Sequence, residues 1–395
     1  MTKYLLISLL YFFSTTLTAQ KSSLRLVSME SIVCGNARFD KYLPLISGKK
    51  TALVVNHASM INGIHLSDTL KSLGVDVVKI FTPEHGYKGT AAEGKYVANG
   101  KISKDSTIIV SLYGIKRKPS PQDLDGIDVV VFDLQDVGVR FYTYISTMTL
   151  VMEACAENNI PIIVLDRPNP NGFYVDGPVL EKEYKSFVGM HPVPVVYGMT
   201  IGEYAGMVNG EGWLKNGVKC DLTIVKMLNY NHNLIVKLPV KPSPNLPDWR
   251  SVYLYPSLGF FEGTVVSVGR GTETPFQMYG HPGITYGNHY FIPKANNISL
   301  NPKLKNDTCR GELLVSYASR FMTNPRQLNI SWLIKAYNNL KGKEKFFNSY
   351  FIKLAGTPQL QKQIEAGKTV EEIRKSWQPA LKKFKKIRKK YLIYK

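Results

Sequence analysis

Five short runs rich in β-branched residues recur in the first half of the chain and constrain its fold more than any other feature. They cover residues 51–55, 75–81, 106–112, 127–132 and 160–165. Each run is almost continuously apolar, which is typical of strands covered on both faces, whereas a strand with one wet face alternates apolar and polar residues. Helical patterns occupy 67–73, 143–157 and 200–213, and 220–227 is a further strand candidate. This order predicts an α/β fold built on a parallel sheet.

Polar residues or turn formers follow each of the five runs directly. They are Asn56-His57, Pro83-Glu84-His85-Gly86, Tyr113-Gly114, Asp133-Leu134-Gln135-Asp136 and Asp166-Arg167-Pro168-Asn169. In open parallel sheets, ligands bind beyond the carboxyl ends of the strands. Five such ends in succession therefore predict a binding site at this edge of the sheet.

The two ends of the chain and its middle suggest how it is organised. Residues 1–20 have the order of a secretory signal, with Lys3, an apolar run over 4–13 and small residues after it. We therefore expect an exported protein, periplasmic or secreted, with no membrane span after signal cleavage. The proline-rich stretch 241–247 predicts a domain boundary near residue 250.

Much of the positive charge lies in the C-terminal tail. The formal net charge is +20, and residues 371–395 contain ten Lys or Arg and two Glu. Apolar residues at 381, 384, 387 and 391 recur with helical spacing, so we expect a solvated terminal helix with its lysines in water. Attraction to anionic cell-wall polymer is a further expectation. Nucleic acid is not an expected partner, because no reader motif accompanies the charge.

Carboxylates are the main candidates for chemistry. Glycoside hydrolysis generally needs one acid for the leaving oxygen and a second group to supply or activate the nucleophile. Glu84, Glu262, Asp133 and Asp136 are the candidates. Two structural alternatives stay open: Glu84 as a turn carboxylate that binds backbone amides, and Asp133 or Asp136 as the partner of a structural arginine.

Three arginines, Arg140, Arg167 and Arg270, lie beside glycine or carboxylate clusters. Arginine binds carboxylates through paired, planar hydrogen bonds, so one of them is a candidate for a sugar that carries a carboxylate. The alternative is an arginine that holds a loop through backbone carbonyls. No HExxH, P-loop, GxGxxG or GxSxG motif is present, and we expect neither a metal nor a cofactor.

Seven motifs spread over the chain resemble those of the NamZ-type exo-β-N-acetylmuramidase family. They are residues 53–59, 83–86, 132–144, 166–170, 262–264, 269–272 and 376–379. The resemblance implies a Rossmann-like catalytic domain over 21–250, a smaller α+β auxiliary domain over 251–395, and a cleft between them. It also implies removal of β-linked N-acetylmuramic acid from the non-reducing end of peptidoglycan fragments in cell-wall turnover. The glutamate of the 83–86 motif, here Glu84, is the catalytic residue that the resemblance implies.

The second catalytic group stays open at this stage. The 2-acetamido group of the sugar is one candidate nucleophile, as in substrate-assisted glycosidases, with Glu262, Asp133 or Asp136 orienting it. Candidate sugar-binding residues are Asn56, His85, Tyr113, Gln135, Arg140, Tyr142, Asp166, Arg167, Asn169 and Arg270. The alternative function is an exported two-domain sugar-binding protein without catalysis.

Overall fold

The structure, a computed structural model, describes residues 25–27, 29–91, 100–101, 107–321, 327–342 and 344–394. The predicted signal peptide over residues 1–20 lies outside these ranges. Within them, no helix has both the length and the apolar character that crossing a membrane requires.

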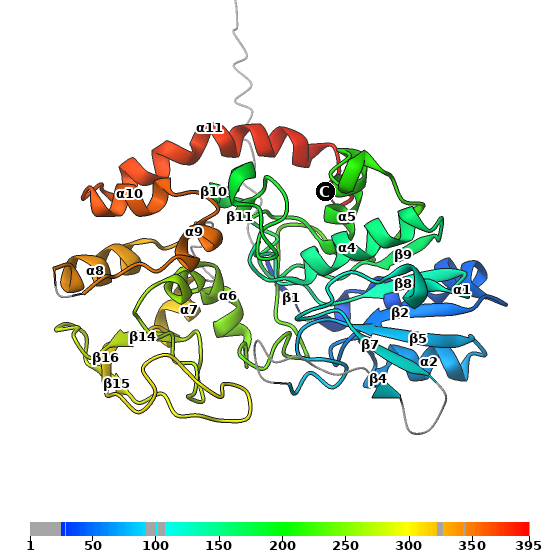
Figure 1. Cartoon of the computed structure of the whole chain (residues 1–395), viewed down its shortest axis with the longest axis horizontal. Coiled ribbons are helices and arrows are strands. Elements are labelled where there is room, and N and C mark those ends of the chain that lie inside the picture. The colour runs from blue at the N-terminus through cyan, green and yellow to red at the C-terminus, as the bar shows by residue number, and fades with distance from the viewer. Residues whose placement is uncertain are drawn as a thin grey trace, which may run out of the picture.

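A seven-stranded sheet forms the framework of the N-terminal part (Figure 1). Its strand order is β12 (Leu222–Val225), β9 (Ile162–Leu165), β8 (Val129–Asp133), β2 (Thr51–Val55), β5 (Val77–Thr82), β7 (Ile108–Ser111) and β6 (Gly100–Lys101). All neighbours are parallel except β6, which pairs with β7 in antiparallel orientation. The five predicted strands and the sixth candidate are therefore confirmed, and they lie in one sheet.

Helices cover both faces of this sheet, which explains why every residue of the central strands β2, β8 and β9 is buried. Successive side chains of a strand point to opposite faces. Val54 and Phe132 accordingly pack in the same core cluster as α4 (Tyr144–Glu157) and α5 (Ile201–Gly210). Leu53 and Val131 pack in a second cluster with α1 (Phe39–Ile46) and α2 (Leu66–Ser72).

Smaller elements surround the sheet. β1 (Arg25–Val27) pairs with β13 (Leu234–Val236), β3 (Met60–Ile61) with β4 (Ile64–His65), and β10 (Asp176–Val179) with β11 (Pro194–Val196). The short helix α3 (Pro121–Leu124) follows β7 along the chain.

The C-terminal part is smaller and mixes helices with one antiparallel sheet, as predicted. The sheet has the order β14 (Met278–His281), β16 (Cys309–Leu313) and β15 (His289–Phe291). The helices are α6 (Trp249–Leu258), η5 (Gly259–Gly263), α7 (Val315–Phe321), α8 (Ser331–Leu340), α9 (Tyr350–Ala355), α10 (Gln359–Glu365) and α11 (Val370–Lys389). One core cluster contains residues of both parts, so the division after residue 250 stays a prediction.

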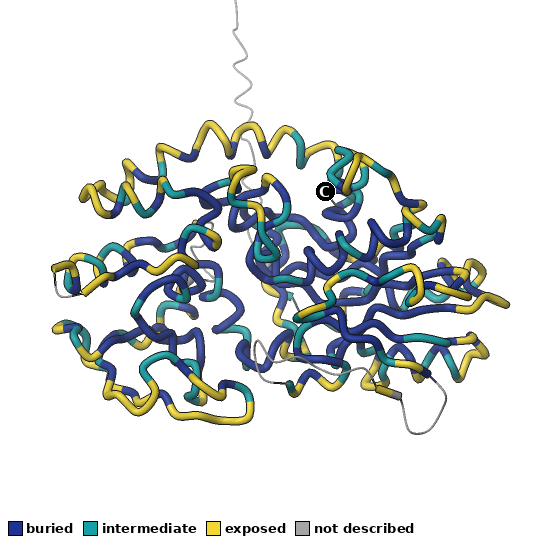
Figure 2. The backbone as a smooth tube through the Cα atoms, viewed as in Figure 1, coloured by how far each residue is buried: buried dark blue, intermediate teal, exposed yellow. Residues whose placement is uncertain are grey.

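Helix α11 corrects the expectation of a solvated terminal helix. Its exposed face does hold the lysines, but Trp377, Leu381 and Phe384 are buried in the main core cluster (Figure 2). The helix crosses over both parts of the molecule (Figure 1). After this helix, the hydroxyl of Tyr394 donates to Asp166 at 2.6 Å. Asp166 also accepts from the Gly202 amide in the first turn of α5. The apolar stripe is therefore a structural tie between the C-terminus and the sheet.

Candidate active site

The turn after strand β5 places Glu84 at the carboxyl edge of the sheet. The Gly86 amide donates to the Pro83 carbonyl at 3.1 Å, which closes the turn. His85 has a φ of 70° and Gly86 a φ of 71°. A positive φ is uncommon for a residue other than glycine, and contacts with the surroundings stabilise it.

The side chain of His85 makes such contacts. Its Nδ1 lies 2.8 Å from the Ala91 carbonyl oxygen and its Nε2 lies 3.3 Å from Ser243 Oγ. Because a carbonyl only accepts, Nδ1 donates, and the neutral ring then accepts the Ser243 hydroxyl at Nε2. His85 thus anchors the turn that presents Glu84.

Glu84 lines two hollows that share Phe141, Thr143, Tyr255 and Arg270 and therefore adjoin each other. The larger hollow has a volume of about 320 Å³ and is formed by both parts of the chain. Such a volume lies within the range of small-ligand pockets. We call the two hollows together the cavity.

Four tyrosines surround Glu84. Tyr113 donates its hydroxyl to the carboxylate, and burial together with the charge of Glu84 raises the pKa of Tyr113. Burial, Glu262 and Glu84 raise the pKa of Tyr350 to about 12. Tyr144 and Tyr255 are buried nearby, and their pKa values are raised by burial and, to a smaller degree, by Glu84. These phenols stay protonated at neutral pH and can donate hydrogen bonds.

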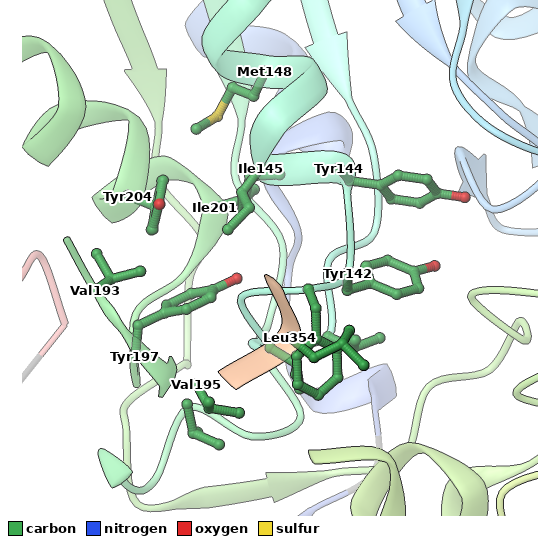
Figure 3. Packing of buried hydrophobic residues seen from close by; sticks show 14 of the residues in the cluster. Tyr142, Tyr144, Ile145, Met148, Val193, Val195, Tyr197, Ile201, Tyr204 and Leu354 are labelled. Carbon is green, nitrogen blue, oxygen red and sulfur yellow. The ribbon is translucent and has the colours of Figure 1, made fainter. Parts of the chain in front are cut away.

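Tyr142 and Tyr144 form one wall of the cavity. Their ring centroids lie 4.6 Å apart in an edge-to-face arrangement, and Figure 3 shows both hydroxyls on the same side. Asn56 Nδ2 donates to the Tyr144 hydroxyl at 2.9 Å, and the Tyr142 hydroxyl donates to the Pro242 carbonyl at 2.7 Å. Both rings are therefore fixed before a ligand arrives.

Glu262 and Arg270, from the C-terminal part, form an ion pair in the lining of the cavity. Arg270 donates through Nε at 2.9 Å and through one terminal nitrogen at 2.7 Å, both to Glu262 Oε2. Burial raises the pKa of Glu262 to about 7, an effect that the charge of Lys303 opposes. The two charge-assisted bonds from Arg270 also favour the ionised carboxylate. Lys303 Nζ stabilises the segment 261–266 around Glu262 by donating to the carbonyls of Phe261 at 2.8 Å and Val266 at 3.2 Å.

Comparisons with known proteins identify the family. Residues 51–250 match the model described as "Exo-beta-N-acetylmuramidase NamZ, N-terminal", and residues 253–394 match its C-terminal counterpart. The chain belongs to the NamZ family. It is 38% identical over 380 residues to "Peptidoglycan beta-N-acetylmuramidase NamZ" of Bacillus subtilis (strain 168), covering 89% of each chain.

Two solved structures from Bacteroides fragilis NCTC 9343, both described as DUF1343 family proteins, have the same fold. One superimposes with a TM-score of 0.84 at 42% identity, and the other with 0.74 at 28% identity. Each alignment covers 92% of this chain and 99% of the solved chain.

Six of the residues predicted for the site line the cavity of this NamZ family member. They are Glu84, His85, Tyr113, Tyr142, Glu262 and Arg270. Asn56 does not line the cavity but positions Tyr144, which does.

Asp133 and Arg167 do not line the cavity, which corrects the expectation that they meet the sugar. Arg167 donates to both carboxylate oxygens of Asp133, at 2.5 Å and 2.8 Å, and Asn36 donates to the same carboxylate at 3.2 Å. Both members of the pair are buried. This is the structural Asp–Arg pair that the sequence left open as an alternative.

Asp136, Gln135 and Asn169 are also buried away from the cavity. Asp136 accepts the Tyr197 hydroxyl and, at 2.7 Å, the Gly138 amide, and burial raises its pKa to about 6. Gln135 Nε2 donates to the carbonyls of Asp136 and Pro168, and Asn169 Nδ2 to that of Met199. Most of their polar groups cross-link loops of the sheet part, and none of the three residues lines the cavity.

Arg140 and Asp166 complete the corrections. Arg140 is fully buried and donates to the carbonyls of Pro178, Val193 and Leu354, at 2.9, 2.8 and 2.7 Å. Asp166 accepts from Thr200 Oγ1 at 2.7 Å and from the Gly202 amide at 2.8 Å, where it caps α5. Both residues join elements that are distant in sequence.

Several other residues that line the cavity were not among the predicted site residues. They are Arg117, Phe141, Thr143, Tyr144, Ser243, Asn245, Tyr255, Phe276, Tyr350 and Lys353. The available signals were the 132–144 motif, which contains Phe141, Thr143 and Tyr144, and the position of Arg117 in the loop after the third strand run. Among the described residues, no group of three or more His, Cys, Asp or Glu side chains could hold a metal ion.

Proposed function

We propose that this protein is an exported exo-acting glycosidase that releases N-acetylmuramic acid from the non-reducing end of peptidoglycan fragments, with Glu84 as the catalytic acid. One observation carries the assignment of the acid. Glu84 is a carboxyl group held at the end of a central strand, inside a cavity whose walls come from both parts of the chain. The B. subtilis relative is named for its action on peptidoglycan.

The surrounding residues suit general acid catalysis. Glu84 gives its proton to the glycosidic oxygen as the bond to the anomeric carbon breaks. The Tyr113 hydroxyl, which donates to Glu84, fixes the direction of that carboxyl group. In the following step Glu84, now ionised, accepts a proton from the water that attacks the anomeric carbon.

Glu262 is our candidate for the second group. Of the three carboxylates considered for this role, it is the one that lines the cavity. Because Arg270 pairs with it, Glu262 suits an orienting task better than nucleophilic attack. In this scheme the acetamido oxygen of the sugar attacks the anomeric carbon, and a carboxylate that accepts the amide proton holds it in position.

A chromogenic assay tests the function. The purified protein should release para-nitrophenol from para-nitrophenyl β-N-acetylmuraminide. A sugar-binding protein without catalysis would bind N-acetylmuramic acid in calorimetry and release no phenol. Export is tested separately by the mass of the mature protein, which should lack about the first 20 residues because signal peptides are removed.

A further inference from the structure

The cavity contains more positive charge than its acid–base chemistry requires. Arg117, Arg270 and Lys353 all line the larger hollow. Arg270 is engaged with Glu262, whereas the arginines first considered for a sugar carboxylate, Arg140 and Arg167, are buried elsewhere. Two cations, Arg117 and Lys353, therefore need an explanation.

Neither cation has a hydrogen-bond or ion-pair partner within the part of the chain that the structure describes. No ion pair or hydrogen bond is formed by Arg117 or by Lys353, and both side chains are exposed. Most neighbouring cations do have partners: Lys116 pairs with Asp123 at 2.8 Å and Lys118 with Glu157 at 2.7 Å. Among the cations that line the larger hollow, Arg270 has an ion-pair partner in the described residues, whereas Arg117 and Lys353 do not.

We propose that Arg117, together with Lys353 of α9 in the lining of the same hollow, binds the lactyl carboxylate that distinguishes N-acetylmuramic acid from N-acetylglucosamine. The inference rests on the proposed function, since it assigns a specificity residue to that reaction. Arginine presents two parallel N–H donors that match the two oxygens of a carboxylate. A lysine ammonium adds electrostatic attraction and does not need to occupy the plane of these two hydrogen bonds.

The position of Arg117 suits this role. Its guanidinium lies 4.4 Å from the centroid of the Phe187 ring, and the Phe187 ring centroid is 6.5 Å from that of Tyr113. Stacking on an aromatic face holds the guanidinium without using its N–H donors, which leaves them for a ligand.

The same group is close to the catalytic centre. The charge of Arg117 partly offsets the raised pKa of Tyr113, and Tyr113 donates to Glu84. One side chain thus separates the proposed anion site from the acid, which fits two groups that act on the same sugar ring.

Lys353 approaches from the C-terminal part. It lies three residues after Tyr350 on α9, and residues with this spacing share one face of a helix. Both line the larger hollow. The proposed anion site thus takes one cation from each part of the chain.

The test compares Arg117→Gln and Lys353→Gln with wild type on two substrates. These are para-nitrophenyl β-N-acetylmuraminide with its free lactyl carboxylate, and the methyl ester of the same compound. We expect Arg117→Gln to lower kcat/KM on the free acid about ten-fold or more, the scale of one charge-assisted hydrogen bond, with little change on the ester. Lys353→Gln should have a smaller effect of the same kind, and Arg117→Lys should retain part of the preference.

A binding measurement gives a second readout. The Kd of free N-acetylmuramic acid should rise about ten-fold in Arg117→Gln, while that of N-acetylglucosamine stays the same. Lys116→Gln and Lys362→Gln are matched controls, because each removes one cation that does not line the cavity. Both should behave like wild type.

The outcomes separate this inference from the proposed function. A folded wild-type protein that releases no phenol from the muraminide contradicts the proposed function. An active wild type whose Arg117→Gln variant keeps the full preference for the free acid overturns the inference alone. Equal losses on acid and ester also overturn it, since Arg117 would then support the cavity without reading the carboxylate.

Discussion

Glu84 is the residue on which the proposed chemistry depends. Glu84→Gln keeps the shape of the side chain and removes its exchangeable proton. General acid–base catalysis contributes about 10²–10⁴-fold, so kcat on a natural disaccharide should fall by that factor. The loss should be smaller for a para-nitrophenyl glycoside, because this phenol leaves without protonation.

Two measurements accompany this prediction. The Kd of N-acetylmuramic acid should change little, since the amide still fills the same space. Glu371→Gln, an exposed glutamate on α11, is the control and should retain full activity. If a folded Glu84→Gln protein turns over the disaccharide at a near-normal rate, another group is the acid.

Asp136 gives a pH-dependent prediction at the same scale. Burial raises its pKa to about 6 in the folded protein, whereas an unperturbed aspartate has a pKa of about 4. The folded state therefore binds this proton more tightly than the unfolded state does. The stability that Asp136 contributes is fully present below about pH 4, decreases as the pH rises to about 6, and is constant above that value.

Asp136→Asn removes this titration. The free energy of unfolding of wild type minus that of the variant should fall by about 2–3 kcal/mol between pH 4 and pH 6, at about 1.4 kcal/mol for each unit of pKa difference. Urea unfolding at several pH values measures it. A difference that does not vary with pH would show that Asp136 is not protonated more readily in the folded state.

The sequence predicted the position of Glu84 but not the roles of most neighbouring polar residues. Glu84 follows a recognisable strand, and a residue directly after a central strand reaches the edge of the sheet. Whether a polar residue there faces outward depends on partners that are distant in sequence. Arg167 meets Asp133 across 34 positions, and Arg140 meets Leu354 across 214. Spacing along one sequence does not indicate such partners.

At the scale of elements, the strands were predictable because burial on both faces leaves a continuous apolar run. Helices α4 and α5 were predictable from their period, and α5 also from the Thr200–Glu203 capping box that the structure contains. The positions of Tyr350 and Lys353 in the cavity could not be predicted in this way. Their helix, α9, has only 6 residues, which is too short to show a helical period of apolar residues. The part of the cavity wall that α9 supplies therefore became visible only in three dimensions, whereas Glu262 and Arg270 of the same wall were already candidates.

Helix α11 provides the prediction for this scale. Phe384 is buried in the core, whereas Lys385 next to it is exposed. Phe384→Ala should lower the free energy of unfolding by about 3–5 kcal/mol, because it removes buried surface and leaves a cavity. Lys385→Ala should change it by less than about 0.5 kcal/mol. Thermal and urea unfolding of the two variants measure the difference, and equal small effects would mean that the helix is only solvated.

At the scale of the whole molecule, the active site depends on both parts of the chain at once. Glu84 and Tyr113 come from the sheet part, whereas Glu262, Arg270 and Tyr350 come from the C-terminal part. Helix α11 and the tail return to the sheet part, with Arg388 Nε donating to the Gly198 carbonyl at 2.8 Å. We infer that this return holds the two walls of the cavity at a fixed separation.

The exposed face of α11 has a different expected role, and it leads to the last prediction. Lys382, Lys383, Lys385 and Lys386 are exposed and lie on one helix that crosses the outside of the molecule (Figure 2). Substituting all four with Gln should leave the turnover of a soluble disaccharide unchanged, because none of them lines the cavity. It should weaken sedimentation with insoluble, anionic cell wall at low salt. The effect should disappear near physiological salt, where charges are screened over about 8 Å.

The matched control replaces Lys49, Lys182, Lys185 and Lys362, which are exposed elsewhere, and removes the same net charge. If both quadruple variants lose the same fraction from the pellet, the total charge of the protein matters and α11 is not a specific contact surface.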